Sequence, residues 1–283
     1  MHAIHETNAH SLQRRVTRTG PFEDELGDGE WFVGRPFTTQ LLNTYTLLVP
    51  GGEKFVIRSC RQYMDKASAQ LQDELMTLFF QEGSHSREHE RMLKAMQKRG
   101  LDSKVFRAIV DWMAYRFLEP LTPRKLRLAT AAAIEHHNAV ISTYFLEQDL
   151  LKDVSAPQTR RLFLWHFCEE IEHKETVYKL MKKINISWLS RTVGMVFSFT
   201  TFLAYLLTGS LVLSVKTGAW KRSGFWKNLA NELFSSRGLG RLLVRESVQY
   251  VKPDFYPSLA STRELLSLSL SELERLQGAS RHD

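Results

Sequence analysis

Apolar residues in this chain recur every three or four positions over long stretches, the periodicity of helices with one buried face. Residues 31–49 are aromatic and apolar and end at Pro50-Gly51-Gly52, and further breakers stand at Gly100, Pro120 and Thr122-Pro123. The pattern predicts helices over residues 53–67, 70–99, 102–118, 126–149 and 156–183. We therefore expect an all-α fold in which residues 102–118 form a crossover helix.

Three polar side chains share a narrow face of the predicted helix 70–99. Glu82, His85 and His89 fall within about 60° of one another at about 100° per residue. Leu75, Leu78 and Phe79 continue this side of the helix into a core. A carboxylate and two imidazoles beside apolar residues are costly to bury, and a divalent metal neutralises them most directly. The alternative is a histidine pair hydrogen-bonded to a glutamate.

A second copy of this pattern lies on the predicted helix 156–183. His166, Glu170 and His173 again share one face, and Glu170 and His173 repeat the Glu-x-x-His spacing of Glu82 and His85. Glu169 lies near the same face and competes with Glu170, but the Glu-x-x-His spacing favours Glu170. Two such helices facing one another would bracket a pair of metal ions.

Single glutamates on two other predicted helices complete the set of candidate metal ligands. Glu135 follows an alanine-rich segment whose small side chains let neighbouring helices approach closely. His136 and His137 point away from the face of Glu135, so we expect them beside the centre or at the surface. Glu53 opens its predicted helix, where a glutamate commonly interacts with the helix dipole, so its assignment as a ligand depends on the other residues.

The order of these motifs predicts the architecture. A lone glutamate, Glu-x-x-His, a crossover, a second lone glutamate and a second Glu-x-x-His are typical of di-metal carboxylate bundles. We expect a flexible segment over residues 1–30, a ferritin-like four-helix bundle over 31–185 and an added C-terminal helical layer over 186–283. The predicted ligands are Glu53, Glu82, His85, Glu135, Glu170 and His173, with His89 and His166 as additional ligands.

The C-terminal region is first apolar and then basic. Residues 192–215 form 24 consecutive positions without a charge, which is long enough to span a bilayer. Their serines and threonines favour a helix packed on the bundle instead, with a break at Gly209. Residues 216–245 hold seven Lys or Arg against Glu232, a net +6 of the chain's +7. With Trp220 and Trp226 nearby, this favours an anionic membrane surface over nucleic acid, whereas a solvated basic face is the alternative.

Composition adds few constraints. Two cysteines are too few for a disulfide scaffold, so we expect a reducing cytoplasm. Membrane association through residues 192–245 is an alternative to packing on the bundle. The polar start of the chain predicts no signal peptide. No dinucleotide-binding, P-loop or serine-hydrolase motif occurs. The pattern is compatible with a homodimer.

These residues together resemble a known family. Pro50-Gly51-Gly52-Glu53, the segment from Gln81 to His89, Glu135-His136 and the segment from Trp165 to Lys174 resemble bacterial "predicted metal-dependent hydrolases", which are similar to ferritin-like di-iron proteins. Phe255-Tyr256-Pro257 resembles a further element of that family, in which histidine is more usual in the middle. The resemblance covers residues 30–265 and implies a metal site at the matching residues and a hydrolase activity.

Carboxylates combined with imidazoles suit two iron or manganese ions better than zinc. The first functional expectation is an oxygen-activating di-iron oxidase or oxygenase acting on a small hydrophobic or acyl-bearing substrate. The second is a two-metal hydrolase, and the third is a non-enzymatic metal-binding protein.

Overall fold

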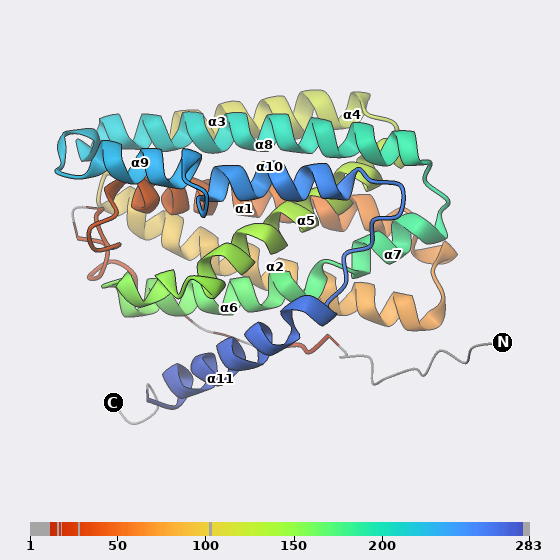
Figure 1. Cartoon of the computed structure of the whole chain (residues 1–283), viewed down its shortest axis with the longest axis horizontal. Coiled ribbons are helices and arrows are strands. Elements are labelled where there is room, and N and C mark those ends of the chain that lie inside the picture. The colour runs from red at the N-terminus through yellow and green to blue at the C-terminus, as the bar shows by residue number, and fades with distance from the viewer. Residues whose placement is uncertain (1–11, 16, 18, 28, 102–103, 280–283) are drawn as a thin grey trace.

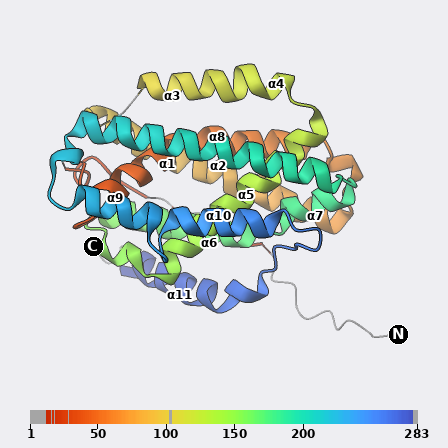
Figure 2. The same ribbon diagram turned by 45° about the horizontal axis from the view of Figure 1, so that its top comes forward.

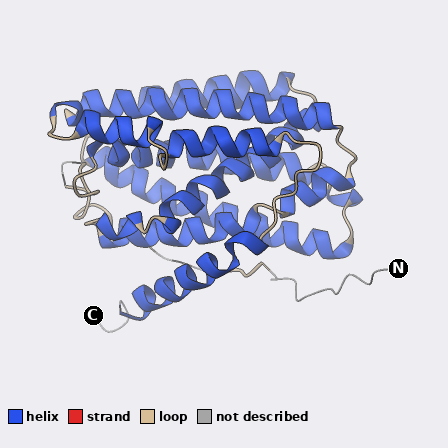
Figure 3. Ribbon diagram, in the orientation of Figure 1, coloured by secondary structure: helices blue, strands red, loops and turns tan. Residues whose placement is uncertain are grey.

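The computed structural model describes residues 12–279 except 16, 18, 28 and 102–103. Figures 1 and 3 show stacked helices, and no β-strand occurs within the described residues. The all-α prediction is confirmed. The elements are α1 Pro36–Arg61, η1 Met64–Lys66, α2 Ala69–Lys98, α3 Lys104–Asp111, the π-helix η2 Trp112–Leu118, α4 Glu119–Leu121, α5 Arg124–Glu147, η3 Leu150–Asp153, α6 Pro157–His173, α7 Thr176–Lys183, α8 Trp188–Thr217, η4 Ala219–Lys221, α9 Phe225–Phe234, α10 Leu239–Tyr250, η5 Ala260–Thr262 and α11 Arg263–Ala279.

Helix α1 begins earlier than its sequence indicates. The expected break at Pro50-Gly51-Gly52 is wrong, because α1 passes through Pro50 without interruption. Proline removes one backbone N–H from the helix ladder, and the burial of α1 among its neighbours outweighs that loss. Gly51 has a packing role: a Cβ built there would lie 2.4 Å from Cε2 of Tyr115. The glycine therefore lets η2 approach α1 closely.

Helices α1, α2, α5 and α6 enclose the polar centre and follow the predicted order. The Ser68 side chain accepts a hydrogen bond from the Leu71 amide at the start of α2, and Gly100 follows its end with a φ of +68°. Buried alanines of α5 allow its close packing against the other helices. The predicted single helix 156–183 is instead divided into α6 and α7. Contacts of Lys174 with Thr262 and of Glu175 with Leu259 fix the chain at that turn.

The connection between α2 and α5 consists of α3, η2 and α4. The predicted helix 102–118 is found from Lys104 onward, whereas its first two residues lie outside the described part. It continues through Pro120 to Leu121, because the π-helix η2 leads directly into the short helix α4 that contains Pro120. Thr122 does not cap α5, since its hydroxyl donates to the Leu118 carbonyl.

Helices α8 to α11 form the C-terminal layer. Helix α8 lies along α1 and α5, on a side of the bundle rather than over its end (Figures 1 and 2). The expected break at Gly209 is wrong, because this glycine lies inside α8, where its missing side chain admits Thr44 and Phe106. Leu206, Leu213 and apolar residues of α9, α10 and α11 share one core with the bundle.

The described part of residues 12–30 packs against the bundle. Phe22 and Leu26 are buried in the main core, and Thr19 donates hydrogen bonds to Glu88 from its amide and its hydroxyl. This differs from the expected flexible lead-in over 1–30, of which residues 1–11 lie outside the described part. The mainly polar composition of this segment did not indicate that Phe22 and Leu26 would be buried in the core.

Candidate metal centre

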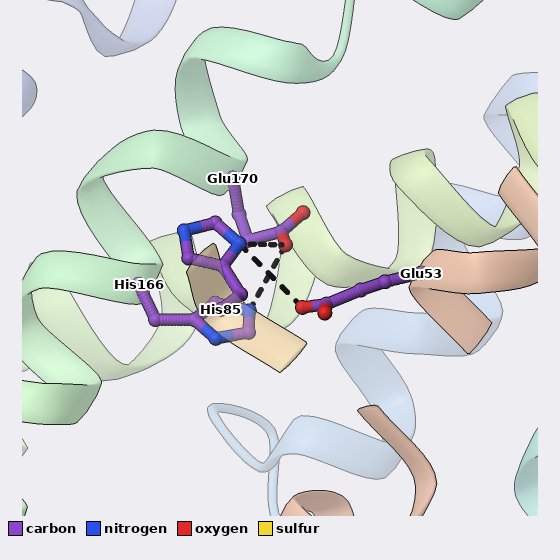
Figure 4. A group of neighbouring side chains, drawn as sticks. All are labelled: Glu53, His85, His166 and Glu170. Atoms are coloured by element: carbon purple, nitrogen blue, oxygen red, sulfur yellow. Dashed lines mark ion pairs between the residues drawn. The ribbon is translucent and has the colours of Figure 1, made fainter. Parts of the chain in front are cut away.

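Seven side chains from four helices converge inside the bundle. Glu53 comes from α1, Glu82 and His85 from α2, Glu135 from α5, and His166, Glu170 and His173 from α6. They form two groups that share Glu170, and the ligand atoms of each group lie within 4.8 Å of one another. One group is Glu53, His85, His166 and Glu170, which Figure 4 shows converging on a common space. The other is Glu82, Glu135, Glu170 and His173.

The buried polar atoms fit a pair of cations. Their side chains are at most 3% exposed, and a buried polar atom without a partner is costly. The atoms that lack a hydrogen-bond partner among the described residues include Glu53 Oε1, both carboxylate oxygens of Glu82, Glu135 and Glu170, and Nδ1 of His85 and His173. These nine atoms belong to the two groups, while other unpartnered buried atoms, such as Ser59 Oγ and Trp165 Nε1, lie outside them. Two divalent cations would give these donors the ligand that the protein does not supply.

The acid–base state of the carboxylates supports this interpretation. Burial, followed by the charge of neighbouring carboxylates, raises the pKa of Glu135 and Glu170 well above the usual range. Burial also raises the pKa of Glu53 to about 8. For Glu82, burial acts in the same direction, but His173 and His85 outweigh it and lower the pKa to about 2. Protons must therefore neutralise much of the centre unless metal ions replace them.

Glu169 and Glu170 have separate contacts. Glu170 Oε1 lies 2.9 Å from His166 Nε2 and 3.7 Å from His85 Nδ1, facing the shared space. Glu169 contacts the opposite ring nitrogen, with Oε2 2.9 Å from His85 Nε2. This contact turns His85 Nδ1 toward the metal space. The Glu-x-x-His spacing thus selected the residue that lies in both ligand groups.

A second outer contact orients His173. Its Nε2 lies 2.8 Å from Gln81 Oε1, and Gln81 in turn donates toward Glu172. Arg15 binds both oxygens of Glu172 at 2.7 and 2.8 Å, and lies 3.7 Å from Glu169 Oε1. The sequence analysis did not predict the supporting roles of Gln81, Glu172 and Arg15. Gln81 had a signal, its place beside Glu82 in the motif, whereas nothing marked Arg15 in a polar lead-in.

His166 and His89 form a connected pair. His166 directs Nε2 toward Glu170, while its Nδ1 lies 2.8 Å from His89 Nε2. His89 Nδ1 then lies 3.2 Å from the Thr46 hydroxyl. His89 is absent from both ligand groups: it lies one helical turn beyond His85, behind His166. Its geometry favours orienting His166 over binding a metal.

The remaining histidines of the bundle and the two cysteines lie outside the groups. His136 and His137 are buried, which corrects the expectation that allowed them a surface position. Their Nε2 atoms lie 3.2 Å from the Glu246 carbonyl and the Ser247 hydroxyl of α10, respectively. They join α5 to the C-terminal layer. Cys60 and Cys168 are buried free thiols.

An apolar cavity of about 100 Å³ reaches the centre beside Glu53. It lies between α1, α5, η2 and α8, and Glu53 is the one charged residue among the described residues that line it. Tyr45 also lines it and places its hydroxyl 3.2 Å from Asn138 Oδ1 and 3.3 Å from His166 Nε2. Four uncharged polar residues, Thr130, Asn138, Ser198 and Thr201, also line it. The main walls are formed by Leu48, Phe55, Val110, Ala114, Tyr115, Leu118, Ile134, Phe197, Phe202 and Tyr205.

One of three comparisons with known proteins found a match, and it agrees with this geometry. Neither the comparison with curated proteins nor that with solved structures gave a match. The family model described as "Predicted metal-dependent hydrolase" matches residues 17–260, which include all seven converging side chains. The chain therefore belongs to the family of predicted metal-dependent hydrolases.

Proposed function

We propose that this protein is a di-iron enzyme that uses dioxygen to oxidise an apolar substrate held beside Glu53. The observation that carries the proposal is the apolar cavity. Most of its wall is apolar and Glu53 is the one charge lining the cavity in the described chain, which disfavours a charged substrate there. Cavities of ~150 Å³ with apolar walls bind benzene-sized molecules, so this smaller space of about 100 Å³ suits a short alkyl segment.

The donor set favours iron. Four carboxylates and three imidazoles without a thiolate suit iron or manganese, whereas zinc sites commonly use fewer carboxylates. Iron bound there would supply the redox chemistry and the reduction of dioxygen. The chain supplies the shared Glu170, the Glu169 contact that orients His85, and apolar walls that exclude water.

Tyr45 lies between the centre and the cavity. Its hydroxyl is near His166 Nε2, and burial raises its pKa well above the usual range, so it remains protonated. A protonated phenol can donate a hydrogen bond toward a substrate or toward the centre. This is the polar handle that we assign to the mainly apolar cavity.

Metal analysis and spectroscopy test the proposal. Protein purified from its own host should contain close to two iron ions per chain, because each of the two groups has the donors for one ion. After reduction without air, admitting dioxygen should change the optical spectrum, and a reductant with a short alkyl substrate should support oxygen consumption. Iron content below one ion per chain, or an unchanged spectrum, would contradict the proposal.

A cavity-filling variant tests the substrate position. Ala114→Trp should block the apolar cavity while leaving both ligand groups intact, since Ala114 lines the cavity but not the metal centre. Substrate-dependent oxygen consumption should fall at least about tenfold with unchanged iron content. Ala108→Trp is the matched control, because Ala108 is exposed on α3 of the same connection. Equal activity of both variants would place the substrate elsewhere.

The second candidate is a two-metal hydrolase, which the description of the matched family favours. Such an enzyme would cleave an ester or phosphoester without dioxygen, using a metal-activated water. Anaerobic turnover of an acyl ester that requires the metals, and that survives substitution of zinc or manganese, would select this function over oxidation.

A further inference from the structure

The outward side of α8 carries large exposed apolar residues near both of its ends, with Thr200, Ala204 and Thr208 exposed between them. Helix α8 has 30 residues, so it is roughly 45 Å long, and residues 192–215 contain no charge. It is long and apolar enough to cross a membrane, yet only 28% of its most apolar window is buried. The exposed large apolar residues of α8 are Trp188, Leu189, Val193, Val196, Leu211, Val212 and Val215.

The inward side of α8 shows that this helix belongs to the bundle. A Cβ at Gly194 would lie 2.8 Å from the Ala129 backbone of α5, and one at Gly209 would lie 2.4 Å from Thr44 of α1. Arg191, in the first turn, is buried and donates to the Tyr178 hydroxyl. Such close packing along α1 and α5 keeps α8 flat on the bundle. A helix held in this way can lie in the plane of a bilayer, but it cannot cross the bilayer.

The neighbouring connection α3–η2–α4 is apolar on two sides. Its inward residues, such as Val110 and Leu118, line the apolar cavity. Its outward residues are apolar as well, and a helix with apolar residues all round is normally buried. Trp112 and Phe117 stack on each other outside, with ring centroids 5.7 Å apart. The exposed apolar residues are Val105 (74%), Ile109 (51%), Trp112 (57%), Met113 (39%), Phe117 (51%) and Leu121 (69%).

Charge around these two elements is positive. Residues 176–231 contain no Asp or Glu, while Lys182 and Lys183 precede α8 and Lys221 and Lys227 follow it. The acids of the connection are paired, Asp111 with Arg107 and Glu119 with Arg58. Exposed cations and tryptophans at both ends of an apolar strip are the pattern of helices that lie on anionic membranes. The exposed cations of the connection and its continuation are Lys104, Arg116, Arg124 and Lys125.

We propose that the outward sides of α3–η2–α4 and α8, which we term the outer apolar face, dock on an anionic phospholipid bilayer with α8 in the membrane plane. Both elements lie on the same side of the molecule, opposite α11 (Figures 1 and 2). A twofold contact between two copies would bring like charges together, whereas an anionic leaflet complements them. The apolar cavity lies between η2 and α8, so an acyl chain could enter it from the leaflet.

Vesicle flotation tests this proposal with the full-length, metal-loaded protein. Vesicles of equal parts phosphatidylcholine and phosphatidylglycerol should carry the protein upward at low salt, and phosphatidylcholine alone or high salt should weaken binding. The double variant Trp112→Asp/Phe117→Asp, and separately Val196→Asp/Leu211→Asp, should each reduce binding at least about tenfold, because each removes two inserted apolar side chains.

Leu268→Asp is the matched control, since Leu268 is 64% exposed on α11, on the opposite side of the molecule. It should bind vesicles like the unchanged protein. Circular dichroism and metal content should be unchanged in every variant. The proposal concerns binding and does not depend on the reaction catalysed.

Two results would overturn the proposal. The first is failure of the unchanged protein to float with anionic vesicles at low salt. The second is a concentration-dependent dimer in sedimentation velocity that both double variants abolish, with no vesicle binding. That result would assign the outer apolar face to a second copy of the chain.

Discussion

Adjacent residues at the metal centre face different partners. Glu170 belongs to both ligand groups, whereas Glu169 contacts the outer nitrogen of His85. Consecutive helical residues point about 100° apart, so one carboxylate can enter the metal space while its neighbour supports a ligand from behind. In the same way, Gln81 contacts the outer nitrogen of His173, and His89 contacts the outer nitrogen of His166. The histidines are thereby held in one orientation before metal binds.

The Glu169/Glu170 pair supports a direct prediction. Glu170→Ala should reduce the metal content by more than one ion per chain, because this carboxylate is common to both groups. Glu169→Ala should leave two ions bound but weaken their affinity by about 10- to 100-fold, the usual effect of losing an outer contact. Metal titration of the two apoproteins measures the difference. Equal losses would mean that Glu170 is not the shared ligand.

Gly51 supports a second prediction. Gly51→Ala should destabilise the protein by about 1–3 kcal/mol, because its Cβ would overlap the Tyr115 ring at 2.4 Å. Gly52→Ala is the control: there the nearest atom to a Cβ is the Tyr115 hydroxyl, at 4.0 Å, and alanine favours helix by up to ~1 kcal/mol. Denaturant unfolding of both variants checks the sign. A loss at Gly52 as large as at Gly51 would refute the packing argument.

Among the elements, α8 has two different sides. Its inward side is fitted to α5 and α1 at glycines, and its outward side is apolar and exposed. The connection α3–η2–α4 has the same character, with cavity-lining residues inside and large apolar residues outside. The apolar cavity lies between these two elements. Its walls therefore depend on how closely α8 and η2 approach α1 and α5.

The close approach of α8 to α5 can be measured. Gly194→Ala should lower stability by about 1–3 kcal/mol, because the new methyl group would lie 2.8 Å from the Ala129 carbonyl carbon and 2.9 Å from the Thr130 amide nitrogen. Backbone atoms cannot move aside as a flexible side chain can. Thr200→Ala, at an exposed position of the same helix, should change stability by less than about 0.5 kcal/mol. Similar unfolding midpoints for the two variants would contradict this packing.

At the scale of the whole molecule, the same helices supply the candidate metal centre and the hydrophobic core. Apolar residues of α1, α2, α5 and α6 and of the C-terminal layer share a core cluster, and the seven converging side chains are buried among the same four bundle helices. Ordering of the helices therefore forms the site, and the site links the helices.

Metal removal should therefore destabilise the whole chain. Chelation should lower the thermal unfolding midpoint, and re-adding iron should restore it, because ions that bind only the folded state stabilise it by about 2.7 kcal/mol at 100 times the dissociation constant. In Glu170→Ala, the difference between chelated and metal-loaded protein should largely disappear. An unchanged midpoint on chelation of the parent protein would show that the centre is not coupled to folding.

Much of this protein followed from local pattern. The helical period predicted the all-α fold, and the Glu-x-x-His spacing identified Glu82, His85, Glu170 and His173, because residues three apart in a helix face the same way whatever surrounds them. Glu135 and His166 were found from their positions relative to those motifs. Glu53 was found as well, even though its helix was expected to start at the wrong place.

Tertiary structure alone decided the rest. Whether Pro50 and Gly209 break a helix depends on the burial and close contacts available there, and both are retained inside helices α1 and α8. That His89 stands behind His166, and that Arg15 reaches Glu172 from far away in the chain, are contacts between segments that no periodicity encodes. The apolar cavity likewise exists only where α1, α5, η2 and α8 meet, because its walls come from four separate parts of the sequence.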